Sequence, residues 1–86
     1  MSPSETFERA LDQLGGTVPE RKRSVVIAGH GTSVSVEPIF WDELRAVADA
    51  RGISMNGLVG EIDRDRDGSL SSAIRVFALA QVRATA

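Results

Sequence analysis

The chain has 86 residues, no cysteine and one histidine, and its ten basic and twelve acidic side chains give a net charge of −2. A chain this short forms one domain at most and buries only about 60% of its unfolded surface, so an additional source of stability is expected. Without cysteine it has neither disulfides nor thiolate metal sites, and we expect no metal and no cofactor. Self-association remains as the expected source of further buried surface. The acidic balance lacks the overall basic signature of a nucleic-acid-binding protein.

Location is inferred from what the chain lacks. No apolar run approaches the roughly 20 residues that cross a bilayer. The first 13 residues do not show a basic region followed by an apolar stretch, which is the pattern of a secretory signal. We therefore expect a cytoplasmic protein.

Residues 1–20 are expected to form an N-terminal arm ahead of a domain over residues 21–83. Within the arm, residues 4–14 could make a short helix that ends at Gly15-Gly16, with three large apolar residues on one face: Phe7, Leu11 and Leu14. Because isolated helices below about 12–15 residues are marginal in water, this segment is either frayed or docked. Residues 17–24, which include a basic run, are predicted to be a linker.

One short strand is predicted before the helices. Val25–Ile27 is β-branched, but two glycines in residues 28–31 indicate a turn or bulge. Thr32–Val36 alternates as a half-buried strand does, with its valines inward and its serines outward. A lone strand needs a partner for its backbone groups, and no matching strand follows it. We therefore expect it to pair with the same strand of a second copy, antiparallel about a two-fold axis.

Three helices are predicted: Pro38–Arg51, Met55–Arg64 and about residues 72–83. Ser54 and Ser71 are the expected caps of the second and third helices. The apolar stripe of the first helix contains Phe40, Leu44, Val47 and Ala48. That of the second contains Met55, Leu58, Val59 and Ile62. That of the third contains Ile74, Phe77, Ala78 and either Leu79 or Val82.

This order of strand, helix, tight turn and helix over Thr32–Ile62 resembles the ribbon–helix–helix fold of Arc-type and MetJ-type repressors. It is more similar still to a subfamily of short bacterial ribbon–helix–helix proteins. Those share a basic lead-in and a GH-x-TS ribbon start, here Arg21–Ser33, and a third helix that opens LSSA, here Leu70–Ala73. The resemblance covers about residues 21–83.

The resemblance implies a mainly α fold with one short strand, in an intertwined homodimer whose strands form an intermolecular antiparallel two-stranded ribbon. An extra C-terminal helix completes the fold. The residues expected in the dimer core are Val34, Val36, Phe40, Leu44, Val47, Leu58 and Ile62.

The resemblance also implies DNA contacts. Base contacts fall on the outward ribbon positions, which are Gly31, Ser33 and Ser35. Phosphate contacts fall on the start of the second helix and on the basic run, which are Ser54, Met55, Asn56, Arg21, Lys22 and Arg23. Each has a simpler interpretation: Ser54 as a helix cap, and the basic run as solvated charge. His30 could join the DNA face, although a local role in the turn is favoured.

Other signals are weaker. Residues 63–70 match the first eight places of an EF-hand loop, but Ile74 stands where the bidentate glutamate belongs, so a charged turn is favoured over calcium. Trp41 adjoins the first helical stripe, which favours packing in the core over an exposed contact. We expect no enzyme, since the single histidine has no evident orienting partner.

Two functions follow. The first is a DNA-binding transcriptional regulator of ribbon–helix–helix type, with the dimer ribbon in the major groove. The alternative is a dimeric protein–protein interaction module on the same scaffold that does not bind DNA. A continuous positive ribbon face favours the first, and a neutral or negative one favours the second.

Overall fold

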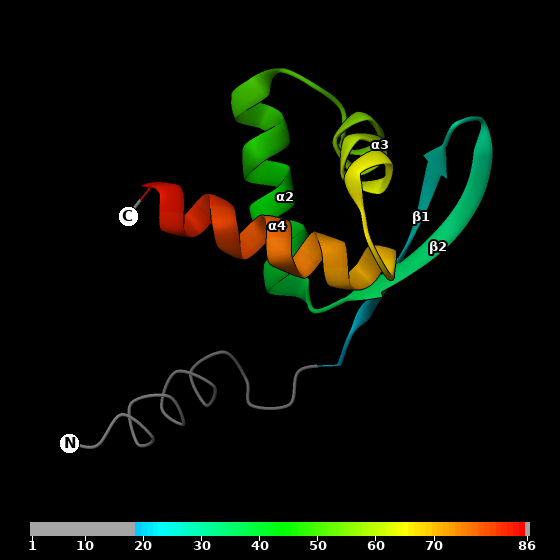
Figure 1. The fold of residues 1–86 in the computed structure, drawn as a ribbon, viewed down its shortest axis with the longest axis horizontal. Helices are drawn as coiled ribbons and strands as arrows, with labels where there is room; N and C mark the ends of the chain where they lie inside the picture. Colours follow the sequence, from blue (N-terminus) through cyan, green and yellow to red (C-terminus); the bar gives the residue numbers. More distant parts are fainter. Residues whose placement is uncertain (1–18, 86) are drawn as a thin grey trace.

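The computed structural model describes residues 19–85, which form a hairpin followed by three helices (Figure 1). The predicted helix over residues 4–14 lies outside the described residues. Over residues 19–85, no helix is long and apolar enough to cross a membrane. The elements are β1 (Arg21–Ile27), β2 (His30–Val36), α2 (Pro38–Arg51), α3 (Met55–Asp65) and α4 (Leu70–Thr85).

The strand over Thr32–Val36 pairs within its own chain, so the prediction of a single strand is wrong. β1 and β2 form an antiparallel two-stranded sheet, with Arg21 opposite Val36 and Ile27 opposite His30. The two residues between the strands, Ala28 and Gly29, have φ angles of 52° and 81°. Two left-handed residues in a two-residue loop are typical of a type I′ turn, whose twist matches that of the strands. The predicted linker is therefore strand from residue 21 onward.

α3 and α4 cover one face of the hairpin, and α2 packs mainly on these two helices (Figure 1). α3 packs against β1, and α4 packs against β2. Because directly opposed residues share a face in an antiparallel pair, the covered face carries Val25, Val34 and Val36, and all three valines are buried. The inward valines of β2 are thus placed as predicted, but the first partners of their strand come from β1.

The helix boundaries follow their capping residues. α2 has Pro38 in its first turn and ends at Gly52, whose φ is 68°, the left-handed value that favours glycine. α3 begins after Ser54, whose side-chain oxygen accepts a hydrogen bond from the backbone N–H of Gly57 at 3.0 Å. α4 begins at Leu70, because Ser69 rather than Ser71 caps it by accepting from the N–H of Ser72 at 3.2 Å. The predicted cap at Ser71 is wrong by two residues.

The core lies between the helices and the covered face of the hairpin. Trp41 is buried, as the sequence indicates, while Phe40 and Val47 are half-buried at its margin. Leu79 and Val82 are exposed, which corrects their predicted inward position on α4. The buried residues are Val25, Val34, Val36, Trp41, Leu44, Ala48, Leu58, Val59, Ile62, Ile74 and Ala78.

Candidate nucleic-acid interface

The face of the hairpin that points away from the helices brings together residues from both strands. The register places Lys22 opposite Ser35, Ser24 opposite Ser33, and Val26 opposite Gly31. We call these six residues the outer hairpin face. The three residues expected to contact bases, Gly31, Ser33 and Ser35, therefore share one face. Gly31 and Ser33 are exposed there, and Ser35 is half-buried.

The basic run is divided between the two faces of the hairpin. Lys22 lies on the outer hairpin face, where it is exposed, whereas Arg21 and Arg23 alternate onto the opposite face. A strand points successive side chains to opposite sides, so three adjacent cations cannot all face one ligand. The sequence places the basic run in a linker and assigns all three of its residues to phosphate contacts, whereas in the structure the run is part of a strand.

Arg21 and Arg23 are held against the single tryptophan. The indole N–H of Trp41 donates a hydrogen bond to the backbone carbonyl of Arg21 at 2.9 Å. The guanidinium carbon of Arg23 lies 5.8 Å from the centre of the Trp41 ring, within cation–π range. Trp41 thereby fixes the first half of β1 on the core. This structural role of the basic run is missing from the sequence interpretation, because nothing in the sequence pairs residue 41 with residues 21–23.

The whole hairpin is cationic, although the chain is acidic. Residues 21–36 contain three cationic residues and no carboxylate, in a chain whose net charge is −2. His30 is exposed at the turn. The hairpin is therefore locally positive, as α4 also is, and a local excess of positive charge is what a nucleic-acid surface requires when the total charge is unfavourable.

The start of α3 lies beside β1. The side-chain oxygen of Asn56 accepts a hydrogen bond from the backbone N–H of Val26 at 3.2 Å. In the first turn of a helix, backbone N–H groups have no partner within the helix, and they can hold an anion. Ser54 is the cap of this helix, so its hydroxyl is already engaged by Gly57. Met55 and Asn56 thus offer backbone N–H groups next to the hairpin.

The Asn56 contact also shows which backbone groups of the hairpin point away from the partner strand. Because the N–H of Val26 bonds to Asn56, it points away from β2. Backbone groups alternate along an antiparallel pair, so those of Lys22 and Ser24 also point away from β2. On the other strand, the backbone groups of Gly31, Ser33 and Ser35 point away from β1, toward the free edge of β2.

A cluster of three charged residues joins β2, α2 and α4 below the hairpin. Arg75 donates to Glu37 at 2.8 Å and to Glu20 at 2.6 Å. The hydrogen bond from Arg75 holds the pKa of the Glu37 carboxyl below its usual range. This cluster connects the start of α2 to the first half of α4, and it brings the beginning of the described chain to the same place.

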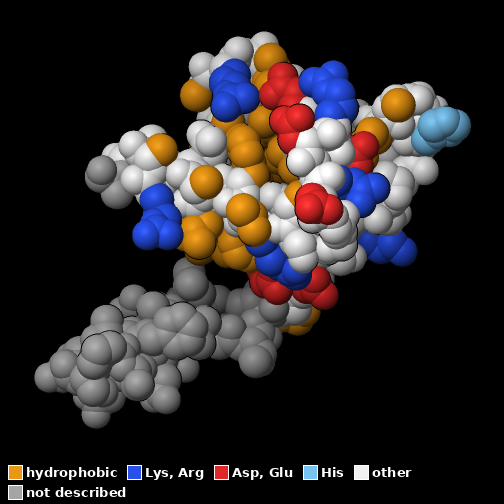
Figure 2. Space-filling view, in the orientation of Figure 1, with side chains coloured by type: hydrophobic (Ala, Val, Ile, Leu, Met, Phe, Trp, Pro, Cys, Tyr) orange, Lys and Arg blue, Asp and Glu red, His pale blue; other side chains and the backbone are white. Residues whose placement is uncertain are grey.

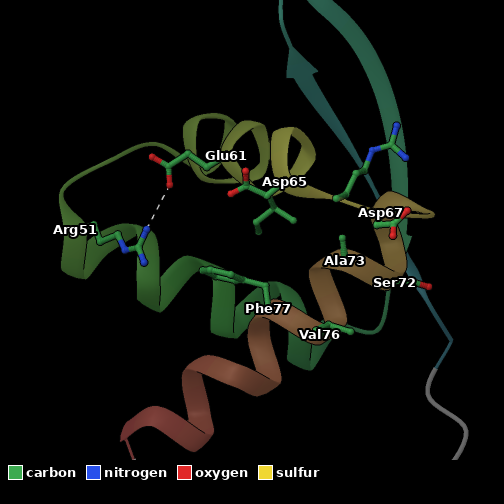
Figure 3. A pocket seen from close by; sticks show the side chains of 10 residues that line it. Arg51, Glu61, Asp65, Asp67, Ser72, Ala73, Val76 and Phe77 are labelled. Carbon is green, nitrogen blue, oxygen red and sulfur yellow. Dashed lines mark hydrogen bonds and ion pairs between the residues drawn. The ribbon is translucent and has the colours of Figure 1, made fainter.

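A hollow of about 480 Å³ lies between α3 and α4 (Figure 3). Its floor is apolar, with Ile62, Ala73 and Phe77, and its mouth carries the Arg51–Glu61 ion pair at 3.3 Å. No cysteine lines it, and its lining contains no histidine. Its chemistry is that of an apolar depression with a charged rim.

The EF-hand-like segment forms a turn held by its own arginine. Arg66 donates to the Asp63 carboxylate at 2.6 Å and also bonds to the carbonyl of Gly68. Among residues 19–85, no group of three or more acidic, histidine or cysteine side chains is placed to hold a metal ion. An arginine thus occupies the carboxylate that a calcium loop would use first.

Comparison with known proteins gives one match. A family model described as "Ribbon-helix-helix domain" matches residues 20–82, which is most of the chain and includes the hairpin and nearly all of the three helices. No curated protein and no solved structure matches the chain.

Proposed function

Because the chain belongs to the ribbon–helix–helix family, we propose that it is a DNA-binding transcriptional regulator that places its hairpin in the major groove. The family is typically one of non-catalytic DNA-binding regulators. The observation that carries the proposal is the hairpin itself, which has three cationic residues and no carboxylate.

In the proposed complex, one set of residues supplies affinity for DNA and another recognises the bases. Lys22 on the outer hairpin face and the free N–H groups at the start of α3 contact phosphates. Ser33 and Ser35 contact base edges, where a hydroxyl both donates and accepts and therefore discriminates weakly. Affinity in this arrangement comes mainly from phosphate contacts, which depend on salt and carry little sequence information.

The dimer that we propose uses the free edge of β2. The outward backbone groups of Gly31, Ser33 and Ser35 would pair with the same residues of a second copy. The free edge of β1 is unsuited to this role, because Asn56 of α3 already covers it at Val26. Pairing two copies through β2 gives a four-stranded sheet in the order β1, β2, β2 and β1, with the two-fold axis between the inner strands.

The dimensions of such a sheet fit the groove. Four strands spaced about 4.8 Å apart span about 14 Å, close to the major groove width of about 12 Å. The inner strands then bring their serines over the bases. The outer strands bring Lys22 of each copy toward the two phosphate backbones. The division of Lys22 and the serines between neighbouring strands is what this geometry needs.

The alternative function is a protein-interaction module on the same scaffold. It is favoured by one observation, which is that the outer hairpin face has a single cation among six residues and includes the half-exposed Val26. The two functions differ in whether the face binds polyanions at low salt.

A gel shift on genomic fragments at low salt tests the DNA proposal. We expect wild-type protein to shift DNA, and Lys22→Gln to weaken binding because a phosphate contact is lost from each protomer. Arg83→Gln is the matched control: it removes the same charge from an exposed position on α4, far from the hairpin, and should leave binding unchanged. No shift by wild-type protein at low salt, or equal effects of both variants, would contradict the proposal.

Sedimentation of two proline variants tests the assembly. Ser33→Pro removes an N–H from the free edge of β2, and Ser24→Pro removes one from the free edge of β1; neither N–H lies in the hairpin ladder. We expect the Ser33 variant to be monomeric at micromolar concentration and the Ser24 variant to remain dimeric. Two dimeric variants, each with the helical circular dichroism of wild type, would show that β2 is not the pairing edge.

A further inference from the structure

The solvent face of α4 carries an apolar stripe that nothing in residues 19–85 covers. Val76, Leu79 and Val82 are 69%, 55% and 47% exposed. Their spacing of three residues places them along one side of the helix. In the space-filling view, apolar side chains gather over α4 between basic side chains at its two ends (Figure 2). The only charged residues of α4 are Arg75 and Arg83, and both are cationic.

The beginning of the described chain is anchored to α4 near this stripe. Glu20, the second described residue, accepts a hydrogen bond from Arg75 of α4 at 2.6 Å. On a helical projection, Arg75 lies between Val82 and Leu79 on the exposed side of α4. Glu20 therefore lies beside the apolar stripe.

The preceding residues have the complementary pattern. In residues 4–14, Phe7, Leu11 and Leu14 recur at helical spacing, and the charged residues are three acidic and one basic. We propose that residues 4–14 form an amphipathic helix that docks its apolar side on the α4 stripe of the same chain. The acidic residues of the segment then lie near Arg83, since Arg75 already pairs with Glu20 and Glu37.

The connection is long enough for docking within one chain. Five residues lie between Leu14 and Glu20, and the six steps between their Cα atoms reach about 20 Å when extended. The stripe from Arg75 to Val82 extends about 10 Å along the helix axis. Gly15 and Gly16 permit the chain to reverse direction between the segment and the anchored Glu20.

The hollow of Figure 3 is a poorer receptor for the same segment. Its rim sets Glu61, Asp65 and Asp67 against Arg51 and Arg66, and this net charge of −1 would repel the acidic side of the segment. At the α4 stripe, Arg75 and Arg83 are balanced by Glu20 and Glu37, which pair with Arg75. The exposed face of α4 is therefore the less repulsive receptor for an acidic segment. This inference is independent of DNA binding.

Disulfide trapping tests the docking, since the chain has no native cysteine. Leu11→Cys is combined in turn with cysteine at positions 76, 79 and 82, which covers either direction and any register of the docked helix. Gln13→Cys, from the polar side of the segment, is the matched control with the same three partners. We expect at least one Leu11 pair to form a disulfide within one chain at least tenfold faster than its Gln13 counterpart. Equal rates in the two series, or disulfides only between chains, would overturn the proposal; the latter would assign the stripe to a second copy.

Thermal unfolding of the full chain gives a second measurement. Leu11→Glu should lower the Tm by several degrees, and Gln13→Glu should leave it unchanged. In a Leu79→Glu background, Leu11→Glu should cause little further loss, because the two residues contribute through one contact. Additive losses would contradict the docking.

Discussion

Ala28 has a positive φ of 52° at the first position of the hairpin turn, where glycine, asparagine and aspartate are preferred. A left-handed conformation costs an alanine roughly 1–2 kcal/mol, and asparagine tolerates it better. We expect Ala28→Asn to stabilise the protein by about 0.5–1 kcal/mol, which is an increase in Tm of about 3–6 °C for a domain of this size. Gly29→Ala, which forces a second alanine into φ 81°, should have the opposite effect. A variant no more stable than wild type in thermal melts would mean that the turn does not limit stability.

Gly31 is a second position at which a single substitution is expected to change a measurable property, here DNA affinity. It lies on the outer hairpin face, and a Cβ built there meets nothing within 4 Å. Gly31→Arg should therefore fold normally and add a cation to the surface that we propose for DNA. We expect tighter DNA binding and a steeper salt dependence, because each added phosphate contact raises the slope by about 0.9. Unchanged affinity in a fluorescence anisotropy titration would place the DNA surface elsewhere.

At the scale of elements, the helices were predictable and β1 was not. The end of α2 at Gly52 and the start of α3 at the cap Ser54 depend on local backbone chemistry, which a short window of sequence contains. β1 begins with Arg21-Lys22-Arg23-Ser24, which lacks the apolar alternation of a strand. Its inward arginines are accommodated by Trp41, twenty residues away, and its pairing depends on β2. Such non-local contacts leave no periodic signal in the strand itself.

The same distinction applies to the candidate site. The outward positions Gly31, Ser33 and Ser35 were predictable, since alternation alone assigns them to one face. The separation of Lys22 from its neighbours and the bond from Val26 to Asn56 were not, because both depend on β1 being a strand beside α3. The unpredicted features are those that decide which cations can face DNA.

The ion pair between Arg75 and Glu37 connects α4 to the start of α2, and it makes the stability of the fold at low pH depend on Glu37. Arg75 lowers the pKa of Glu37 in the folded protein. A folded pKa below the unfolded value stabilises the fold above the unfolded pKa, and that contribution is lost as the pH falls through the folded value. We expect Glu37→Gln to lower the urea midpoint at pH 7 and to flatten its decline between pH 5 and pH 3. Glu61→Gln, at the exposed Arg51 pair, is the control and should change neither. An equally steep acid decline in the Glu37 variant would contradict this role.

At the scale of the whole molecule, the hairpin decides whether a mutation in the core tests dimerisation or only folding. The strand pattern alone makes Val34→Asp a test of dimerisation, since a lone strand has a core face only in a pair. In the structure Val34 is 6% exposed within its own protomer, so a buried aspartate there unfolds the protomer whatever its assembly state. Dimerisation is therefore tested at the free edge of β2, and the covered face of the hairpin reports only folding.

The central claim is that an acidic protein binds DNA through one cationic hairpin, and salt dependence tests it most directly. The measurement is the affinity for a labelled duplex by fluorescence anisotropy between about 50 and 200 mM salt. If Lys22 of each protomer neutralises one phosphate, affinity should fall about 12-fold over this range. Lys22→Gln should reduce the slope. Absence of binding at 50 mM salt, or binding that salt and Lys22 do not affect, would contradict the account.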